Sequence, residues 1–408
     1  MTRRTLITFL GRVAKNESGY RRTAYAFPGE PPGKPVAFFG WTLAERLRPD
    51  TTIILGTSGS MWDHLFEGDI ALGDAAEAAR LELIDAVEKK AVSTGHLQPL
   101  EAPLSEALGC EVCLRLIPYC RTAREQTELL RIMAACVTGG DEVHIDVSHG
   151  FRHLPMLALL AALYLEVVRG IRVAGIWYGA YDPDTGKAPV HDLSGLLGIA
   201  RWLQALQTYD KDGDYGVFSG LIDGSVGTWL EEASYLESIN RIGQARSRLR
   251  NVFASLDELD GDPALRLFRP ELERRIQWCK KDNYYLRQRQ LALECLAAGR
   301  YVDAILKGWE AFISLLQREA QGESGELFDP DNHEHREAAQ KRFEDRERQR
   351  TPRSERWRAY DALRRLRNAV AHGSQPRGEE VMRALSGAQH MKALLEELFA
   401  RLLPDISP

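Results

Sequence analysis

The run of residues from Leu363 to Gly373 holds the side chains of this sequence best suited to acid–base chemistry. Apolar residues recur in it at helical spacing, so the run is expected to form the last turns of a helix. Gly373 stands where a residue in the left-handed conformation commonly ends a helix. The apolar positions are Leu363, Leu366 and Val370.

The other side of this expected helix is basic and carries one titratable group. At about 100° per residue, Asn368 and His372 lie nearly in line, and Arg365 joins them one turn earlier. Arg367 lies to one side, on a side chain long enough to curl back. A histidine in the last turn meets the negative end of the helix dipole, which favours its charged form, and imidazole already titrates near neutrality. His372 can therefore both accept and donate a proton.

These groups suit the cleavage of RNA without a metal ion. That reaction requires a base for the 2′-hydroxyl, an acid for the leaving 5′-oxygen, and a cation for the charge on the pentacoordinate phosphorus. His372 is expected to act as acid or base, Arg367 to stabilise the charge, and Asn368 to orient the phosphate or the histidine. The alternative is a solvated, arginine-rich helix with a capping histidine, because this spacing also arises by chance in an arginine-rich chain.

The net charge of −5 hides a basic segment. Residues His333–Arg377 contain 13 Lys and Arg against 7 Asp and Glu, so this segment carries +6 and the remainder −11. A basic patch on an acidic protein indicates a partner that carries phosphate. Part of the segment, Glu334–Pro352, is predicted to be an exposed and partly disordered loop because charges crowd in it.

The composition is that of a globular protein. A length of 408 residues suggests two or three domains, and 44% hydrophobic with 27% charged residues is ordinary for a soluble chain. The longest apolar run, Leu154–Val168, is shorter than the roughly 18 residues that cross a membrane, and the N-terminal apolar run is too short for a signal peptide. We therefore expect a cytoplasmic protein without a membrane partner.

The cysteines predict neither disulfides nor a metal site. Six cysteines show no disulfide framework, which fits a reducing compartment. Cys110 and Cys113 have the spacing of half a zinc site, but apolar residues alternate around them as in a strand. Because successive side chains of a strand point to opposite faces, the two thiols would face opposite sides.

Residues 1–200 alternate short apolar runs typical of strands with helical segments, which predicts an α/β fold with a parallel sheet. Ligands of such sheets bind beyond the C-terminal ends of the strands. The strands are expected at Thr5–Leu10, Thr52–Leu55, Val112–Ile117, Val143–Val147 and Arg172–Tyr178. The helices are expected at Asp74–Val92, Ala123–Val137 and His153–Val168.

Residues that can bind a nucleotide follow these strands. The first strand ends at Gly11, and the second runs into Leu55–Asp63, where glycines allow close approach of the backbone. This segment offers hydroxyl groups and an aromatic face for a base, but lacks the Gly-Lys-Ser/Thr of a P-loop. The residues concerned are Gly56, Thr57, Ser58, Ser60 and Trp62.

The fourth strand runs into Asp146–Pro155, where an arginine opens a helix whose free N–H groups favour anions. The alternative is a strand-to-helix turn in which Ser148 caps the helix and Arg152 is merely exposed. The fifth strand adds Tyr178 to the same rim. The candidate ligand residues of the fourth loop are Ser148, His149, Gly150, Phe151 and Arg152.

The order of these motifs resembles the CARF-HEPN ribonucleases of type III CRISPR systems. The resemblance covers nearly the whole chain, although Ser148 stands where threonine is common in that family. It implies a Rossmann-like CARF domain that dimerises and binds a cyclic oligoadenylate, and an all-α HEPN dimer that cleaves single-stranded RNA without a metal. The matching segments are Gly56–Trp62, Asp146–Pro155, Tyr178–Ala180 and Arg367–His372.

The same resemblance implies roles for the residues. Arg367 and His372 would be the catalytic pair with Asn368 beside the arginine, and the loops at 56–62 and 148–152 would contact the messenger. The implied domains are a CARF sensor at 1–200, a helical linker or hinge at 201–262 and a HEPN ribonuclease at 263–408. The implied activator is a cyclic tetra- or hexa-adenylate with no other cofactor, and the implied products carry 2′,3′-cyclic phosphate and 5′-hydroxyl ends. The partners would be single-stranded RNA and a second copy of the chain, in antiviral defence.

The C-terminal half is predicted to be helical throughout and to form a bundle, because no internal repeat is visible. Glu310 is predicted to pair with an arginine of the catalytic face. The helices are expected at Ser194–Thr208, Thr228–Leu259, Ala264–Lys281, Tyr284–Ala298, Tyr301–Ala320, Arg356–Ala371 and Glu379–Leu403.

Two other functions stay open at this point. One is a messenger-binding regulator whose helical domain dimerises or binds RNA without cutting it. The other is a sensor domain that also degrades its own messenger, since hydroxyls such as Ser58 or Ser148 lie where a ring phosphate would pass.

Overall fold

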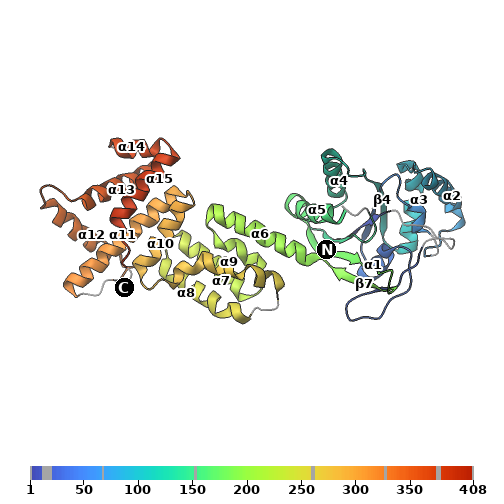
Figure 1. Ribbon diagram of the computed structural model, residues 1–408, viewed down its shortest axis with the longest axis horizontal. Coiled ribbons are helices and arrows are strands. Elements are labelled where there is room, and N and C mark those ends of the chain that lie inside the picture. The colour runs from blue at the N-terminus through green and yellow to red at the C-terminus, as the bar shows by residue number, and fades with distance from the viewer. Residues whose placement is uncertain are drawn as a thin grey trace. The chain divides into compact units, whose positions relative to one another are not determined.

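The computed structural model describes residues 2–11, 21–66, 69–150, 154–258, 262–325, 329–373 and 378–406 (Figure 1). The chain divides into two compact units, Met1–Ile199 and Ala200–Pro408. Residues 201–262, predicted as a helical linker, therefore fall in the second unit together with residues 263–408.

The first unit is built on a seven-stranded sheet with the strand order β2-β7-β6-β5-β1-β3-β4. The four pairings among β6, β5, β1, β3 and β4 are all parallel, which confirms the predicted parallel α/β fold. Strand β7 lies between β6 and the edge strand β2, runs antiparallel to β6 and was not predicted. The strands are β1 (Arg4–Leu10), β2 (Tyr25–Ala26), β3 (Thr51–Gly56), β4 (Glu111–Leu116), β5 (Glu142–Asp146), β6 (Arg172–Gly179) and β7 (Ala188–Asp192).

Helices cover both faces of this sheet, because alternate residues of each central strand point to opposite layers. In β1, Ile7 and Phe9 pack into the core beneath α4 and α5, whereas Leu6 and Leu10 pack on the opposite side. Figure 1 shows α4 and α5 on one side of the strands and α2 and α3 on the other. The helices are α1 (Phe39–Leu47), α2 (Glu77–Glu88), α3 (Thr94–Leu108), α4 (Ala123–Ala135) and α5 (Leu154–Arg169).

Helices α1 and α3 were not predicted. Helix α3 contains Pro99 and Pro103, which normally argue against a helix interior. The helix forms despite these prolines because Ser93 and His96 form a capping box at its start. Leucines at helical spacing also bury one side of it completely or nearly so: Leu97, Leu100 and Leu104.

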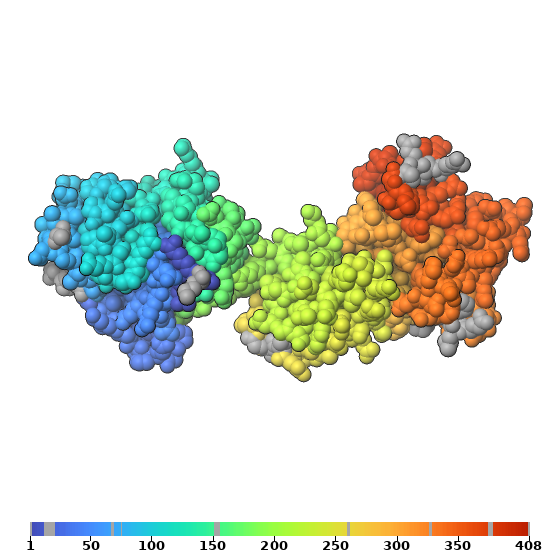
Figure 2. All heavy atoms as spheres, turned by 180° about the vertical axis from the view of Figure 1, so that it is seen from behind, coloured from blue at the N-terminus to red at the C-terminus, as the bar shows by residue number. Residues whose placement is uncertain are grey.

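The second unit is helical throughout its described residues, as predicted. Helix α6 (Ser194–Asp212) begins in the first unit and ends in the second. Figure 2 shows helices α6 to α9, in green to yellow, packed beside the orange to red helices that follow them in the chain. The remaining helices are α7 (Ser225–Ser238), α8 (Ile242–Ser255), α9 (Pro263–Ile276), α10 (Tyr284–Ala297), α11 (Tyr301–Ser324), α12 (His333–Arg348), α13 (Glu355–His372), α14 (Glu379–Leu385) and α15 (Ala388–Leu402).

Three helix predictions for this unit need correction. The segment Glu334–Pro352, predicted to be a loop, forms most of α12, because Asn332 caps it and Ala339 and Phe343 anchor it in the core. The single helix predicted over Thr228–Leu259 is two helices, and Asn240 at φ 59° makes the turn between them. The helix predicted over Glu379–Leu403 breaks at Ser386 and Gly387, between α14 and α15.

None of the described helices combines the length and the apolar character that spanning a membrane requires.

Candidate functional site

The strand order of the first unit reverses between β1 and β5, and open parallel sheets bind ligands beyond the strand ends at such a point. Gly11 follows β1 and Gly150 lies in the loop after β5. A Cβ atom on Gly11 would lie 2.7 Å from the Gly150 nitrogen, so the two backbones meet too closely for any side chain. The two predicted glycines are thus brought together at the point where such sheets bind ligands.

The loop after β3 is held onto β1 by one hydroxyl. Ser60 Oγ accepts a hydrogen bond from the Thr57 N–H at 2.9 Å and donates one to the Leu10 carbonyl oxygen at 2.7 Å. Thr57 and Ser60 are each 1% exposed, whereas Ser58 is half-buried. Of the three residues predicted to offer a hydroxyl from this loop, only Ser58 is partly exposed.

Trp62 is fully buried, which corrects the expectation that its ring offers a face to a base. Its Nε1–H donates to the Thr57 carbonyl oxygen at 2.9 Å, and the ring packs directly under Gly56. A Cβ on Gly56 would lie 2.6 Å from the Trp62 ring. Gly56 and Trp62 therefore shape the loop from below.

The loop after β5 is tied to both neighbouring strands. Thr8 on β1 donates to the buried Asp146 carboxylate at 2.6 Å, and that carboxylate also accepts from the Ser148 N–H at 2.8 Å. Burial raises the pKa of Asp146 to about 6, although these hydrogen bonds act in the opposite direction. Ser148 Oγ accepts from the Gly179 N–H of β6 at 2.7 Å. Residues 151–153, which precede the described part of α5, lie outside the described residues, so the alternative in which Ser148 caps that helix stays a prediction.

His149 is a bridge between the rim and the start of α1. Its Nε2 accepts a hydrogen bond from the Phe39 N–H at 3.2 Å, so this nitrogen carries no proton. Its ring centroid lies 5.4 Å from that of Phe38. Burial, and then the charges of His64 and Arg21, lowers the pKa of His149 to about 3. His149 therefore stays neutral and holds the loop in place.

Tyr178 lies on β6 at the edge of the same rim, with 38% of its side chain exposed. The predicted ligand residues Phe151 and Arg152 lie outside the described residues.

Sequence reasoning missed two residues that follow β4. Tyr119 OH lies 3.5 Å from Ser58 Oγ, and Arg121 places its guanidinium 4.7 Å from the centre of the Tyr119 ring. The hydrogen bond from Ser58 is the largest of several effects that lower the pKa of Tyr119. The predicted strand Val112–Ile117 pointed to this place, because the residues after every parallel strand reach the same rim.

A third missed residue, the second cation among them, comes from the segment before α1. Arg21 lies 3.5 Å above the centre of the Tyr181 ring, just beyond β6, and its charge reaches His149. The rim thus combines backbone N–H groups, the Ser58 hydroxyl, aromatic rings and cations, a set that suits a nucleotide phosphate.

The second predicted site lies at the C-terminal end of α13. Gly373 follows His372 with φ 61°, which confirms the predicted left-handed helix end. Asn368 and His372 are exposed, whereas Arg367 is half-buried. The apolar side of the helix faces the core through Trp357, Tyr360, Leu363 and Leu366.

Glu310 does not pair with the basic side of α13. Its carboxylate forms an ion pair with Arg336 of α12 within the described part of the chain, so that prediction is wrong. The reason is that α12, predicted as a loop, brings its own arginine to this position.

The described residues contain no group of three or more His, Cys, Asp or Glu side chains placed to hold a metal ion. Cys113 lies on β4, and burial raises the pKa of its thiol.

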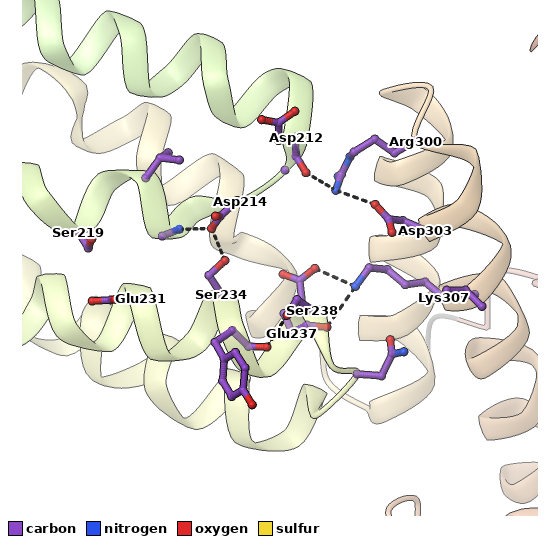
Figure 3. A pocket seen from close by; sticks show the side chains of 16 residues that line it. Asp212, Asp214, Ser219, Glu231, Ser234, Glu237, Ser238, Arg300, Asp303 and Lys307 are labelled. Atoms are coloured by element: carbon purple, nitrogen blue, oxygen red, sulfur yellow. Dashed lines mark hydrogen bonds and ion pairs between the residues drawn. The ribbon is translucent and has the colours of Figure 1, made fainter. Parts of the chain in front are cut away.

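A cleft of about 610 Å³ opens in the second unit between the end of α6, α7 and α11 (Figure 3). Lys307 Nζ lies 2.9 Å from Glu237 Oε1, and both side chains are at least nine-tenths buried. Arg300 donates to the Asp212 carbonyl oxygen at 3.0 Å. These contacts join α11 to α6 and α7 across about 70 to 90 residues of sequence, a separation that periodicity does not reveal.

Comparison with known proteins identifies the first unit. The family described as "CRISPR system endoribonuclease Csx1, CARF domain" matches residues 5–182. The CRISPR-associated protein MJ1674 of Methanocaldococcus jannaschii is 26% identical over 307 residues, which are 69% of this chain and 48% of that protein. The chain therefore spans about half the length of this curated relative.

A solved structure aligns with the whole chain at lower similarity. Enterococcus italicus Csm6, bound to cyclic hexa-2′-fluoro-hexa-dAMP, has 10% identity and a TM-score of 0.39, covering 100% of this chain and 96% of Csm6. With the strand order and the family match over residues 5–182, the first unit is a CARF domain.

Proposed function

We propose that this protein is an endoribonuclease that cuts single-stranded RNA without a metal ion when a cyclic oligoadenylate binds its CARF domain. The observation that carries the proposal is on α13, where Asn368 and His372 are exposed beside Arg367 at the helix end. A CARF domain and this set of acid–base and cationic groups occur in one chain. The proposal assigns the sensor to residues 1–200, a helical linker to 201–262 and a HEPN ribonuclease to 263–408.

The sensor binds its messenger at the rim of the sheet. Backbone groups at Gly11 and Gly150, the Ser58 hydroxyl and the loop at 148–152 meet the ring phosphates, and the cations Arg21 and Arg121 neutralise them. The activator is a cyclic tetra- or hexa-adenylate.

The effector catalyses transesterification. A base removes the proton of the 2′-hydroxyl, whose oxygen attacks the adjacent phosphorus, and an acid protonates the leaving 5′-oxygen. His372 acts as one of these groups, Arg367 stabilises the charge that develops on the phosphorane oxygens, and Asn368 orients the phosphate. The products carry 2′,3′-cyclic phosphate and 5′-hydroxyl ends.

A second copy of the chain supplies the other half of both sites. One Arg-Asn-His set provides one imidazole for two proton transfers, and a cyclic ligand matches a two-fold axis. Helix α5 supports dimer formation, because an apolar side of it is exposed. Its exposed fractions are 74% for Met156, 58% for Leu160, 74% for Val167 and 56% for Val168.

The test is cleavage of a fluorescent single-stranded RNA in EDTA, with synthetic cyclic tetra-adenylate and cyclic hexa-adenylate titrated separately. We expect one ring to activate cleavage, with a bell-shaped dependence on pH, and His372→Ala to abolish it. The matched control is His390→Ala, which removes another exposed histidine of the same unit and should cleave like the wild type.

Activity that disappears in EDTA and returns with magnesium or manganese would contradict the metal-free reaction. Messenger binding without any cleavage would instead favour the regulatory protein that binds RNA without cutting it.

A further inference from the structure

Arg367 differs from the arginines next to it on α13. Arg364 and Arg365 both form ion pairs with Asp361, at 2.7 and 2.5 Å. The Arg367 guanidinium instead lies 4.7 Å from the centre of the Trp309 ring on α11. Within the described parts of the chain, Arg367 has neither a carboxylate nor a hydrogen-bond partner.

The Trp309 ring is itself fixed. It is 5% exposed and stacks on Tyr360 with the ring centres 5.3 Å apart. The Tyr360 hydroxyl donates to Glu344 Oε1 at 2.5 Å and accepts from Gln340 Nε2 at 2.9 Å. Two residues of α12 therefore hold Tyr360, and Tyr360 supports the tryptophan face on which Arg367 lies.

An aromatic face and a carboxylate hold a guanidinium with different consequences. A carboxylate neutralises the positive charge and occupies two of the five N–H donors. An aromatic face attracts the cation through the ring quadrupole and leaves the donors in the guanidinium plane free. Arg367 is thus oriented while its charge and its donors stay available to a phosphate.

We propose that Trp309 is the positioning residue of Arg367 in RNA cleavage. The inference rests on the proposed function and adds to it a residue that the sequence motif does not contain. Trp309 acts through the arginine and does not touch the RNA.

The experiment compares Trp309→Phe with Trp309→Leu in the full-length protein at saturating messenger. Both replacements are smaller than tryptophan and leave space in the core, but only phenylalanine keeps an aromatic face. We expect kcat of the leucine variant to be about tenfold below that of the phenylalanine variant. The KM for RNA and the messenger concentration for half-activation should be the same in both, because Trp309 touches neither ligand.

Trp357 offers a matched control in the same core. It is 8% exposed, its ring centre lies 5.4 Å from that of Tyr360, and Arg353 lies 4.9 Å above it. Trp357→Phe and Trp357→Leu should both lower the melting temperature and should have equal kcat. Equal kcat for the two Trp309 variants would overturn the proposal, since Trp309 would then serve packing alone.

A second measurement needs no RNA cleavage. Equilibrium unfolding of the wild type, Trp309→Leu, Arg367→Met and the double variant should show a coupling of about threefold to tenfold in the folding equilibrium. Additive effects would overturn the contact itself. If the coupling is present but the wild type never cleaves RNA, the proposed function fails, and the assignment of Trp309 to catalysis fails with it. If the wild type cleaves RNA and the two Trp309 variants have equal kcat, only the role of Trp309 is overturned and the proposed function stands.

Discussion

At the scale of single residues, the rim is shaped by polar groups that lie beneath it. Asp146 collects hydrogen bonds from Thr8 and Ser148, and Ser148 reaches on to Gly179. Three strands are thereby joined at the place where the backbone of Gly11 meets that of Gly150. Such a network fixes the loop from below, because the Thr8 and Asp146 side chains that form it are fully buried.

His149 should make the protein sensitive to acid. Its folded-state pKa of about 3 lies below the usual 6.5, so the unfolded chain takes up a proton first as the pH falls. Stability is then lost below about pH 6.5, by about 2 kcal/mol at about pH 5. In His149→Gln, a carbonyl oxygen can accept the Phe39 N–H without titrating, so this loss should be absent. Urea unfolding at about pH 7.5 and about pH 5 measures the difference.

Asp146 changes stability in the opposite direction, because its raised pKa favours the folded state in acid. The wild type and His149→Gln both contain Asp146, so its contribution cancels when their stabilities are compared. The control is His390→Gln, an exposed position that should keep the wild-type dependence on pH. Identical pH dependence of the wild type and His149→Gln would show that His149 does not stay neutral.

Residue types and positions after strands were enough to locate the rim, but not to assign each side chain. Trp62 was assigned to a base because tryptophans commonly stack, yet Gly56 leaves room for its ring below the loop. Tyr119 was missed because its loop has no glycine or hydroxyl pattern of its own. The burial of a ring depends on neighbours that are distant in sequence, and periodicity reports only on the element itself.

At the scale of secondary-structure elements, the end of α13 depends on one glycine. Gly373 has φ 61°, which side chains with a Cβ adopt at a cost of about 1 to 2 kcal/mol. Gly373→Ala should therefore fray the last turn, which carries His372, and lower cleavage severalfold while messenger binding is unchanged. Gly325→Ala is the control, because Gly325 ends α11 with φ 70° and carries no catalytic neighbour. Equal cleavage by the two variants would contradict a role for the last turn.

The Lys307–Glu237 pair should be a strong link between α7 and α11. Removing one partner of a buried pair leaves an uncompensated charge, so Lys307→Met should cost about 3 to 5 kcal/mol in the free energy of unfolding. Lys307→Met combined with Glu237→Leu should regain most of it. Arg248→Met is the control: its pair with Glu232 is 2.6 Å long but 45% exposed on each side, and its loss should cost under about 1 kcal/mol. Denaturant unfolding measures all four proteins, and similar losses for Lys307→Met and Arg248→Met would contradict the buried link.

Helices with a regular apolar stripe were predictable, and those without one were not. Helix α13 was found because Leu363, Leu366 and Val370 mark its inner side. Helix α12 was missed because its buried side consists of little more than Ala339 and Phe343 among many charges. Its fold depends on tertiary contacts such as that between Gln340 and Tyr360, which outweigh the local preference.

At the scale of the whole molecule, the messenger site and the cleavage site must be coupled by a free energy and must still be separable by mutation. A messenger that shifts a two-state equilibrium does so only through its different affinity for the two states. A change at the sensor should therefore alter the messenger concentration that is needed, whereas a change at the effector should alter the cleavage that results.

Arg152→Ala and His372→Ala test this separation. The arginine is predicted from the sequence to make a charge-assisted phosphate contact, worth about 1.5 to 3 kcal/mol, so its loss should weaken messenger binding roughly ten- to a hundred-fold. Saturating messenger should still restore cleavage. His372→Ala should bind the messenger normally and cut no RNA at any messenger concentration.

Arg172→Ala is the control and should behave like the wild type, because Arg172 lies at the opposite end of β6 and its side chain is 77% exposed. Measuring messenger affinity and RNA cleavage for all three decides the matter, because a variant that loses both together would mean that sensor and effector are not distinct sites.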